Sequence, residues 1–152
     1  MILADKRDYS IGYRKHYAAY EKMNKRNADI KSRRLLLIYC VECGLKYRLL
    51  NKWGMDNPKE LLGKTKEELD ADDKRKREVL SSHNLEKILK ELGQQGVFKF
   101  PALKTIHNEI VSAETYHQLY RYGIRTGESK ESKERELENS LNNVLEWLRE
   151  GV

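Results

Sequence analysis

Long apolar runs and prolines are nearly missing from this chain of 152 residues, which contains two prolines. A helix that crosses a membrane needs at least about 17 mostly apolar residues in a row, and no such stretch occurs. The opening residues, MILADKRDYS, also lack the apolar core of a signal peptide. We therefore expect a cytoplasmic protein with no membrane association.

Cysteine is equally scarce, and the two present, Cys40 and Cys43, form a single Cys-x-x-Cys pair. A tetrahedral zinc site would need two more ligands, which His83 or His107 would have to supply. A thioredoxin-like site would need the first cysteine at a helix N-terminus, whereas this pair lies inside an apolar stretch. Glycine-rich phosphate loops and serine-nucleophile motifs are absent as well. We expect two buried thiols, no metal and no cofactor.

The composition favours an all-α fold. Charged residues make up 36% of the chain and hydrophobic residues 39%, which suits helices with narrow apolar stripes and wide charged faces. The period-two alternation of a β-sandwich is absent. The length predicts a single domain. The net charge of +6 is compatible with RNA as a partner but does not require it.

Apolar periodicity predicts five main helices in one bundle. A tyrosine stripe on the first (Tyr13, Tyr17 and Tyr20) is typical of a core-facing side. The third begins at "SSHNLEKILKELG", with Ser81 or Ser82 as its cap and Gly93 at its end. Two capping signals between residues 57 and 68 predict short helices in a solvated region. The expected main helices cover residues of about 9–26, 29–52, 82–92, 102–121 and 132–149. In the fourth of them, the residues expected to face inward are Leu103, Ile106, Ile110, Ala113 and Tyr120.

Three segments in this order resemble the HEPN superfamily of α-helical, RNA-associated domains. They are "YCVECGLKYRLL" at 39–50, "SHNLEKILKELG" at 82–93 and "YHQLYRYGIRTGE" at 116–128. The resemblance covers about 30–149 and leaves the helix at about 9–26 as an addition. It implies a HEPN-like bundle in an antiviral-defence or toxin–antitoxin system, with RNA or a nucleotide-associated partner. It also implies a homodimer and, as a further partner, a nucleotidyltransferase or another defence protein.

Many HEPN proteins are metal-independent ribonucleases with an Arg-x(4–6)-His motif. Arg77 and His83 match that spacing and are the catalytic candidates, with arginine on the phosphate and imidazole moving the ribose proton. However, this pair precedes the His-Asn-Leu segment, whereas the family motif lies on a late helix. No histidine follows the late arginines, so the ribonuclease motif is incomplete there. His117, Arg121 and Arg125 are instead candidates for RNA phosphate binding.

The sequence is compatible with three functions. The first expectation is a protein that contacts RNA without a complete ribonuclease motif. One alternative is a metal-independent endoribonuclease. The other is a non-catalytic interaction subunit of a larger enzyme complex. His83 has a structural interpretation too, as a hydrogen-bonding residue at a helix start.

Glu42 and Lys46 form a polar pair, four residues apart, on the most apolar helix. One interpretation is an exposed pair worth a few tenths of a kcal/mol. The other is a partly buried pair that orients Lys46 towards a cleft facing His83.

Overall fold

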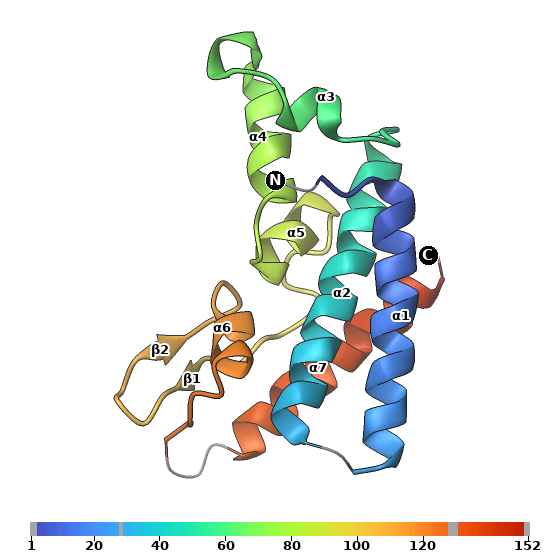
Figure 1. Ribbon diagram of the computed structural model, residues 1–152. Helices are drawn as coiled ribbons and strands as arrows, with labels where there is room; N and C mark the ends of the chain where they lie inside the picture. The colour runs from blue at the N-terminus through green and yellow to red at the C-terminus, as the bar shows by residue number, and fades with distance from the viewer. Residues whose placement is uncertain (1–2, 28, 128–130, 151–152) are drawn as a thin grey trace.

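The computed structural model describes residues 3–27, 29–127 and 131–150, and it confirms the all-α bundle (Figure 1). A two-stranded hairpin is the sole sheet in this part of the chain. The helices are α1 Lys6–Lys25, α2 Ile30–Lys52, α3 Lys59–Leu62, α4 Ala71–Leu80, α5 Leu85–Glu91, α6 Tyr116–Arg121 and α7 Glu131–Arg149, with a 3-10 turn at Lys66–Glu68 and strands β1 Leu103–Lys104 and β2 Ile110–Val111.

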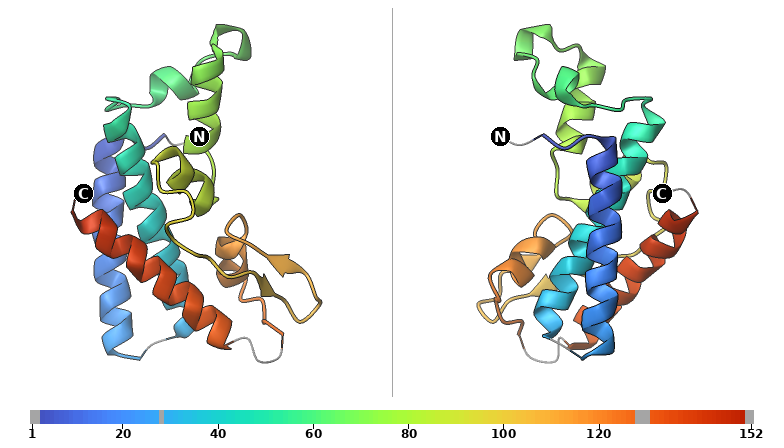
Figure 2. Two further views of the ribbon diagram at one scale, coloured as in Figure 1. Left: turned by 180° about the vertical axis from the view of Figure 1, so that it is seen from behind. Right: turned by 45° about the vertical axis from the view of Figure 1, so that its right-hand side comes forward.

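Helix α2 is the centre of the molecule. Its apolar side is fully buried at Leu37, Leu45 and Leu49. Helix α1 runs antiparallel along one side of α2, α5 and α6 pack on the other, and α7 crosses the bundle (Figures 1 and 2). Within the described residues, no helix is long and apolar enough to span a membrane.

Helix α1 begins at a capping box formed by two aspartates. The Asp5 side chain accepts a hydrogen bond from the Asp8 backbone N–H, and the Asp8 side chain accepts one from Asp5 in return. The tyrosine stripe predicted to face the core does so, because Tyr13 and Tyr20 are buried against α2 and α7 while Tyr17 is half-buried. The helix starts three residues earlier than predicted.

Helix α5 starts later than predicted, and the predicted serine cap is wrong. Asn84 is the cap: its side-chain oxygen accepts hydrogen bonds from the backbone N–H groups of Glu86 and Lys87. Ser82 supports the cap instead, by accepting the Asn84 N–H at 3.0 Å. Gly93, with φ of +76°, ends the helix as predicted. This arrangement leaves His83 immediately before the cap.

The predicted helix at 102–121 is wrong over most of its length. Residues 103–111 form a β-hairpin, with Leu103 opposite Val111, and only α6 remains helical. The side chain of Thr105 explains the turn, since its hydroxyl accepts the backbone N–H groups of His107 and Glu109, both at 3.2 Å. Asn108 adopts φ of +62°, which asparagine tolerates better than most residues.

The hairpin changes which side chains face the core. Leu103, Ala113 and Tyr120 are buried as predicted. Ile106 and Ile110, which were predicted to face inward, are 43% and 70% exposed, because a hairpin does not carry the helical period of the prediction.

A buried acid holds α6 against α7. Glu134 of α7 is 7% exposed and accepts a hydrogen bond from the Tyr120 hydroxyl at 2.9 Å. Its second oxygen accepts the Thr126 hydroxyl at 3.0 Å. The guanidinium of Arg34, on α2, lies 2.8 Å from Glu131 and 3.5 Å from Glu134. Helices α2, α6 and α7 therefore share one polar network inside the bundle.

Candidate active site at a histidine pair

Two imidazoles from distant parts of the chain lie against each other beside α2. The ring centroids of His83 and His117 are 4.6 Å apart, with their planes inclined by 39°. His83 comes from the turn before α5, and His117 comes from the first turns of α6. The Asn84 cap and the hairpin fix these two segments, so the local structure of each helix start positions its histidine.

Glu42 joins the pair from α2. Its carboxylate oxygen Oε1 lies 2.9 Å from His83 Nδ1, and its Oε2 accepts a hydrogen bond from Lys46 at 3.2 Å. A carboxylate at Nδ1 favours the tautomer with the proton on Nδ1, which leaves Nε2 as the proton acceptor. The His83 side chain is 49% exposed, whereas that of Glu42 is 13% exposed. Glu42 is thus a largely enclosed carboxylate behind an accessible imidazole.

The Glu42–Lys46 pair is not the exposed surface pair of the first interpretation. Lys46 is 5% exposed, and its ammonium group forms an ion pair with the Glu42 carboxylate inside the protein. The second interpretation described a partly buried pair that orients Lys46 towards a cleft facing His83. The pair is buried, but the contact with His83 is made by Glu42 and not by Lys46.

His117 is the buried member of the pair, at 5% exposure, and its Nδ1 is enclosed without a hydrogen-bond partner among the described residues. Burial lowers the pKa of His117, and the neighbouring His83 and Arg121 lower it further, while Glu42 acts in the opposite direction. His117 is therefore a neutral imidazole at neutral pH. A neutral neighbour does not repel a proton on His83.

This lowered pKa makes folding pH-dependent. Because the folded state holds His117 neutral, the unfolded state binds the proton first as the pH falls below about 6.5. The free energy of unfolding should therefore decrease from pH 7.5 to pH 5.5, and His117→Gln should show a smaller decrease, as measured by urea denaturation. His107→Gln, at an exposed histidine on the hairpin, is the control and should keep the full decrease. Equal decreases in all three proteins would contradict the assignment.

Arg121 supplies an exposed cation at the same place. It lies one helical turn after His117 on α6, and its Nε donates a hydrogen bond to the Tyr39 hydroxyl of α2 at 3.0 Å. The hydrogen bond to Tyr39 raises the pKa of Arg121, which keeps the guanidinium charged. Tyrosine fixes the arginine without neutralising it, so the charge stays available to an anion.

Two other predicted residues do not join the cluster. The Arg77 guanidinium donates a hydrogen bond to the Lys64 carbonyl at 2.8 Å and lines a groove beside α4. The contacts of His83 are with Glu42 and His117, so the predicted pairing of Arg77 with His83 is not formed. Arg125 lies past α6, where its carbonyl accepts the Ile106 N–H of the hairpin at 3.0 Å. Of the five residues predicted for catalysis or phosphate binding, the structure brings together His83, His117 and Arg121.

Tyr39 is the residue that sequence reasoning missed. Its spacing carried a signal, since Tyr39 and Glu42 are three residues apart and therefore share a side of α2. What the sequence could not supply was the approach of α5 and α6 to that side. Within the described residues, no group of three His, Cys, Asp or Glu side chains is arranged to hold a metal ion.

The two cysteines follow Tyr39 and Glu42 in the sequence of α2. Cys40 is buried, with its thiol donating to the Tyr13 carbonyl, and Cys43 is half-buried. Burial raises the pKa of Cys40 to about 12 and that of Cys43 to about 11. Because the thiolate is the reactive form, both thiols should react with a disulfide reagent near pH 8 roughly 100-fold more slowly in the native protein than in guanidinium chloride. Rapid labelling of the native protein would contradict this burial.

Comparisons with protein-family models, with curated proteins and with solved structures found no match to this chain.

Proposed function

We propose that this protein binds RNA and cleaves it without a metal ion at the histidine pair. The observation that carries the proposal is the contact series Glu42–His83–His117, with Arg121 one turn beyond His117. A carboxylate behind an accessible imidazole is the arrangement of a general base, and an unneutralised guanidinium beside it suits a phosphate.

The chemistry assigns one task to each group. His83 Nε2 takes the proton from a ribose 2′-hydroxyl, and the 2′-oxygen attacks the adjacent phosphorus. The bond from phosphorus to the 5′-oxygen breaks, and the leaving oxygen takes a proton from water. Arg121 binds the non-bridging oxygens, whose charge grows in the transition state. The products are a 2′,3′-cyclic phosphate and a 5′-hydroxyl.

Glu42 is a positioning residue in this scheme. It holds the His83 ring through Nδ1 and stabilises the imidazolium that forms after proton transfer. Lys46 holds the second oxygen of Glu42, which fixes the carboxylate plane. His117 packs against the His83 ring and stays neutral, so it supports the ring without competing for the proton.

The biological setting comes from the resemblance to HEPN proteins in the three quoted segments. It supports an antiviral-defence or toxin–antitoxin system. A homodimer and a nucleotidyltransferase or other defence protein as partner belong to the same proposal.

The test is incubation of the purified full chain with end-labelled total RNA in the presence of EDTA. Cleavage is expected, with 2′,3′-cyclic phosphate ends, while DNA of the same sequence stays intact because it lacks the 2′-hydroxyl. Intact RNA would overturn the catalytic proposal. RNA binding that weakens steeply with salt would then indicate a binding role, and no RNA binding would favour an interaction subunit.

A further inference from the structure

Two surface hollows adjoin the segment that carries His83. Ser82, on one side of His83, lines a groove of about 680 Å³ between the 3-10 turn and α4. Asn84, on the other side, lines a hollow of about 520 Å³ between α5 and the 94–100 segment. Lys87 lines both, so they meet at α5. The proposed proton-transfer residue therefore lies in the chain between two concave surfaces.

The groove is strongly basic. Its lining includes four cations and one carboxylate, that of Glu78, which pairs with Lys87. Two of the cations, Lys66 and Lys74, form no ion pair with any described side chain. The hydroxyls of Ser81 and Ser82 also line it. Ammonium groups together with hydroxyls are the usual partners of nucleic-acid phosphates.

Arg77 acquires a role here that differs from the predicted one. One of its guanidinium nitrogens is held by the Lys64 carbonyl, and the side chain lines the groove. Guanidinium has five N–H donors, so the anchored side chain retains donors for a phosphate.

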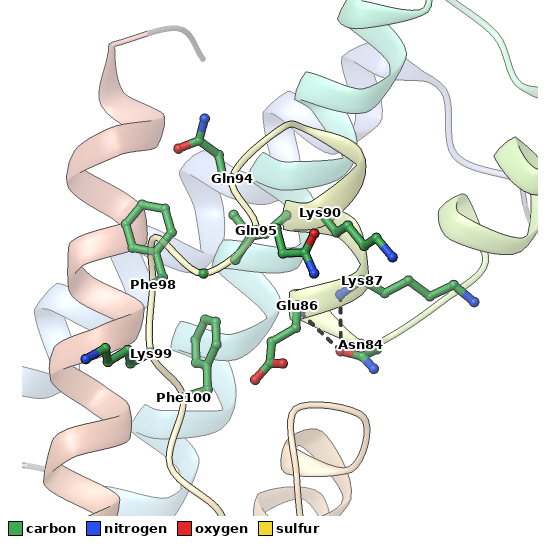
Figure 3. Close-up of a pocket in the computed structure, with 11 residues that line it drawn as sticks. Asn84, Glu86, Lys87, Lys90, Gln94, Gln95, Phe98, Lys99 and Phe100 are labelled. Carbon is green, nitrogen blue, oxygen red and sulfur yellow. Dashed lines mark hydrogen bonds between the residues drawn. The ribbon is translucent and has the colours of Figure 1, made fainter.

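The hollow has a different character. Figure 3 shows Phe98 and Phe100 on the segment after α5, with Glu86 and Gln95 between that segment and the helix, while Lys87 extends away from the rings. Both phenylalanines are half-buried; Phe98 packs near Trp147 and Phe100 near Tyr116. Fixed aromatic rings beside amide and carboxylate groups suit an unstacked base, through its face and its polar edge.

We infer that the substrate is single-stranded RNA, whose phosphates follow the basic groove and one of whose bases enters the hollow. The inference rests on the proposed function and deepens it. Bases inside a duplex are stacked and cannot reach Phe98 or Phe100, whereas a single strand offers a base and its phosphate backbone together. Lys87 lines both the groove and the hollow, so the RNA would pass from one to the other at this residue.

Binding is tested separately from cleavage, with the full chain and fluorescently labelled RNA that carries 2′-O-methyl riboses, which the proposed reaction cannot cleave. A single strand of about 12 nucleotides should bind at least about tenfold more tightly than a duplex of the same sequence. The double variant Lys66→Gln/Lys74→Gln should weaken single-strand binding about tenfold and make the slope of log K against log salt shallower by about 1.4.

The matched control is Lys15→Gln/Lys22→Gln, which removes the same charge from exposed positions on α1, on the other side of α2 (Figure 1). It should leave affinity and salt slope nearly unchanged. Phe98→Leu keeps an apolar side chain but removes the stacking face, and it should weaken single-strand binding about tenfold without changing the salt slope.

Tighter binding of the duplex, equal effects of the two lysine pairs, or no RNA binding would each overturn the inference. Failure of the proposed function gives a different result: the groove variants weaken binding as expected, yet unmodified RNA stays intact. If the groove variants cleave RNA at the normal rate, the catalytic proposal stands, but the substrate does not follow the basic groove.

Discussion

Replacing His83 with alanine is expected to slow metal-free RNA cleavage by about 10²–10⁴-fold, because the variant loses the group that accepts the 2′-hydroxyl proton. Binding of uncleavable RNA should change little, since the charge at Arg121 stays in place. Single-turnover cleavage of labelled RNA, measured beside thermal unfolding, separates loss of chemistry from loss of structure.

Two further variants sharpen this result. Glu42→Gln keeps a side chain of the same size but loses the carboxylate behind His83, so it should lower kcat and leave KM nearly unchanged. His107→Ala removes an exposed histidine from the hairpin and should cleave at the normal rate. The assignment is wrong if His83→Ala retains normal cleavage, or if His107→Ala loses as much.

Replacing Arg34 with methionine should cost roughly 3–5 kcal/mol of unfolding free energy, the usual effect of removing one partner of a buried ion pair. The Arg34 side chain is 3% exposed, and that of Glu134 is 9% exposed. Without arginine, the Glu134 carboxylate loses the cation that compensates its burial, whereas Glu138 keeps its ion pair with Arg33 at 3.3 Å. Equilibrium denaturation by urea measures the loss.

Two controls accompany this measurement. Arg7→Met removes an exposed arginine from α1 and should change the unfolding free energy by at most about 0.5 kcal/mol. Arg34→Lys keeps the charge but not the planar donors, so its loss should lie between those of the other two variants. A loss below about 1 kcal/mol in Arg34→Met would show that the network contributes little to stability.

The long helices were predictable because their apolar residues recur with the helical period. Leu137, Leu141 and Leu148 are buried in α7 as that period requires, and α2 carries the apolar run. The hairpin was not predictable from the same rule. Its short apolar segments around Ile106 and Ile110 fit a helical stripe as well as they fit a hairpin. The hydrogen bonds that the Thr105 hydroxyl accepts favour the hairpin turn, and the apolar pattern does not reveal them.

Within the candidate site, the pairs on one helix were predictable and the contacts between helices were not. The i, i+4 spacing of Glu42 with Lys46 and of His117 with Arg121 follows from helix geometry alone. The contacts between these pairs depend on how α5 and α6 pack on α2, which local patterns do not encode. Arg77 shows the limit of motif spacing: it lies six residues before His83, but its guanidinium binds the Lys64 carbonyl and lines the groove beside α4 rather than contacting the His83 ring.

The hydrogen bond from Tyr120 to Glu134 ties α6 to a helix synthesised after it. Tyr120 lies three residues from His117, and α7 also fills the core beside α2. During translation, α1 and α2 are adjacent in sequence and can pair early, whereas α6 lacks its buried acid until α7 has left the ribosome. A nascent chain would therefore have a loosely held His117 and an unfinished site. For the proposed ribonuclease, such an order of assembly would keep the enzyme inactive beside the messenger RNA that encodes it.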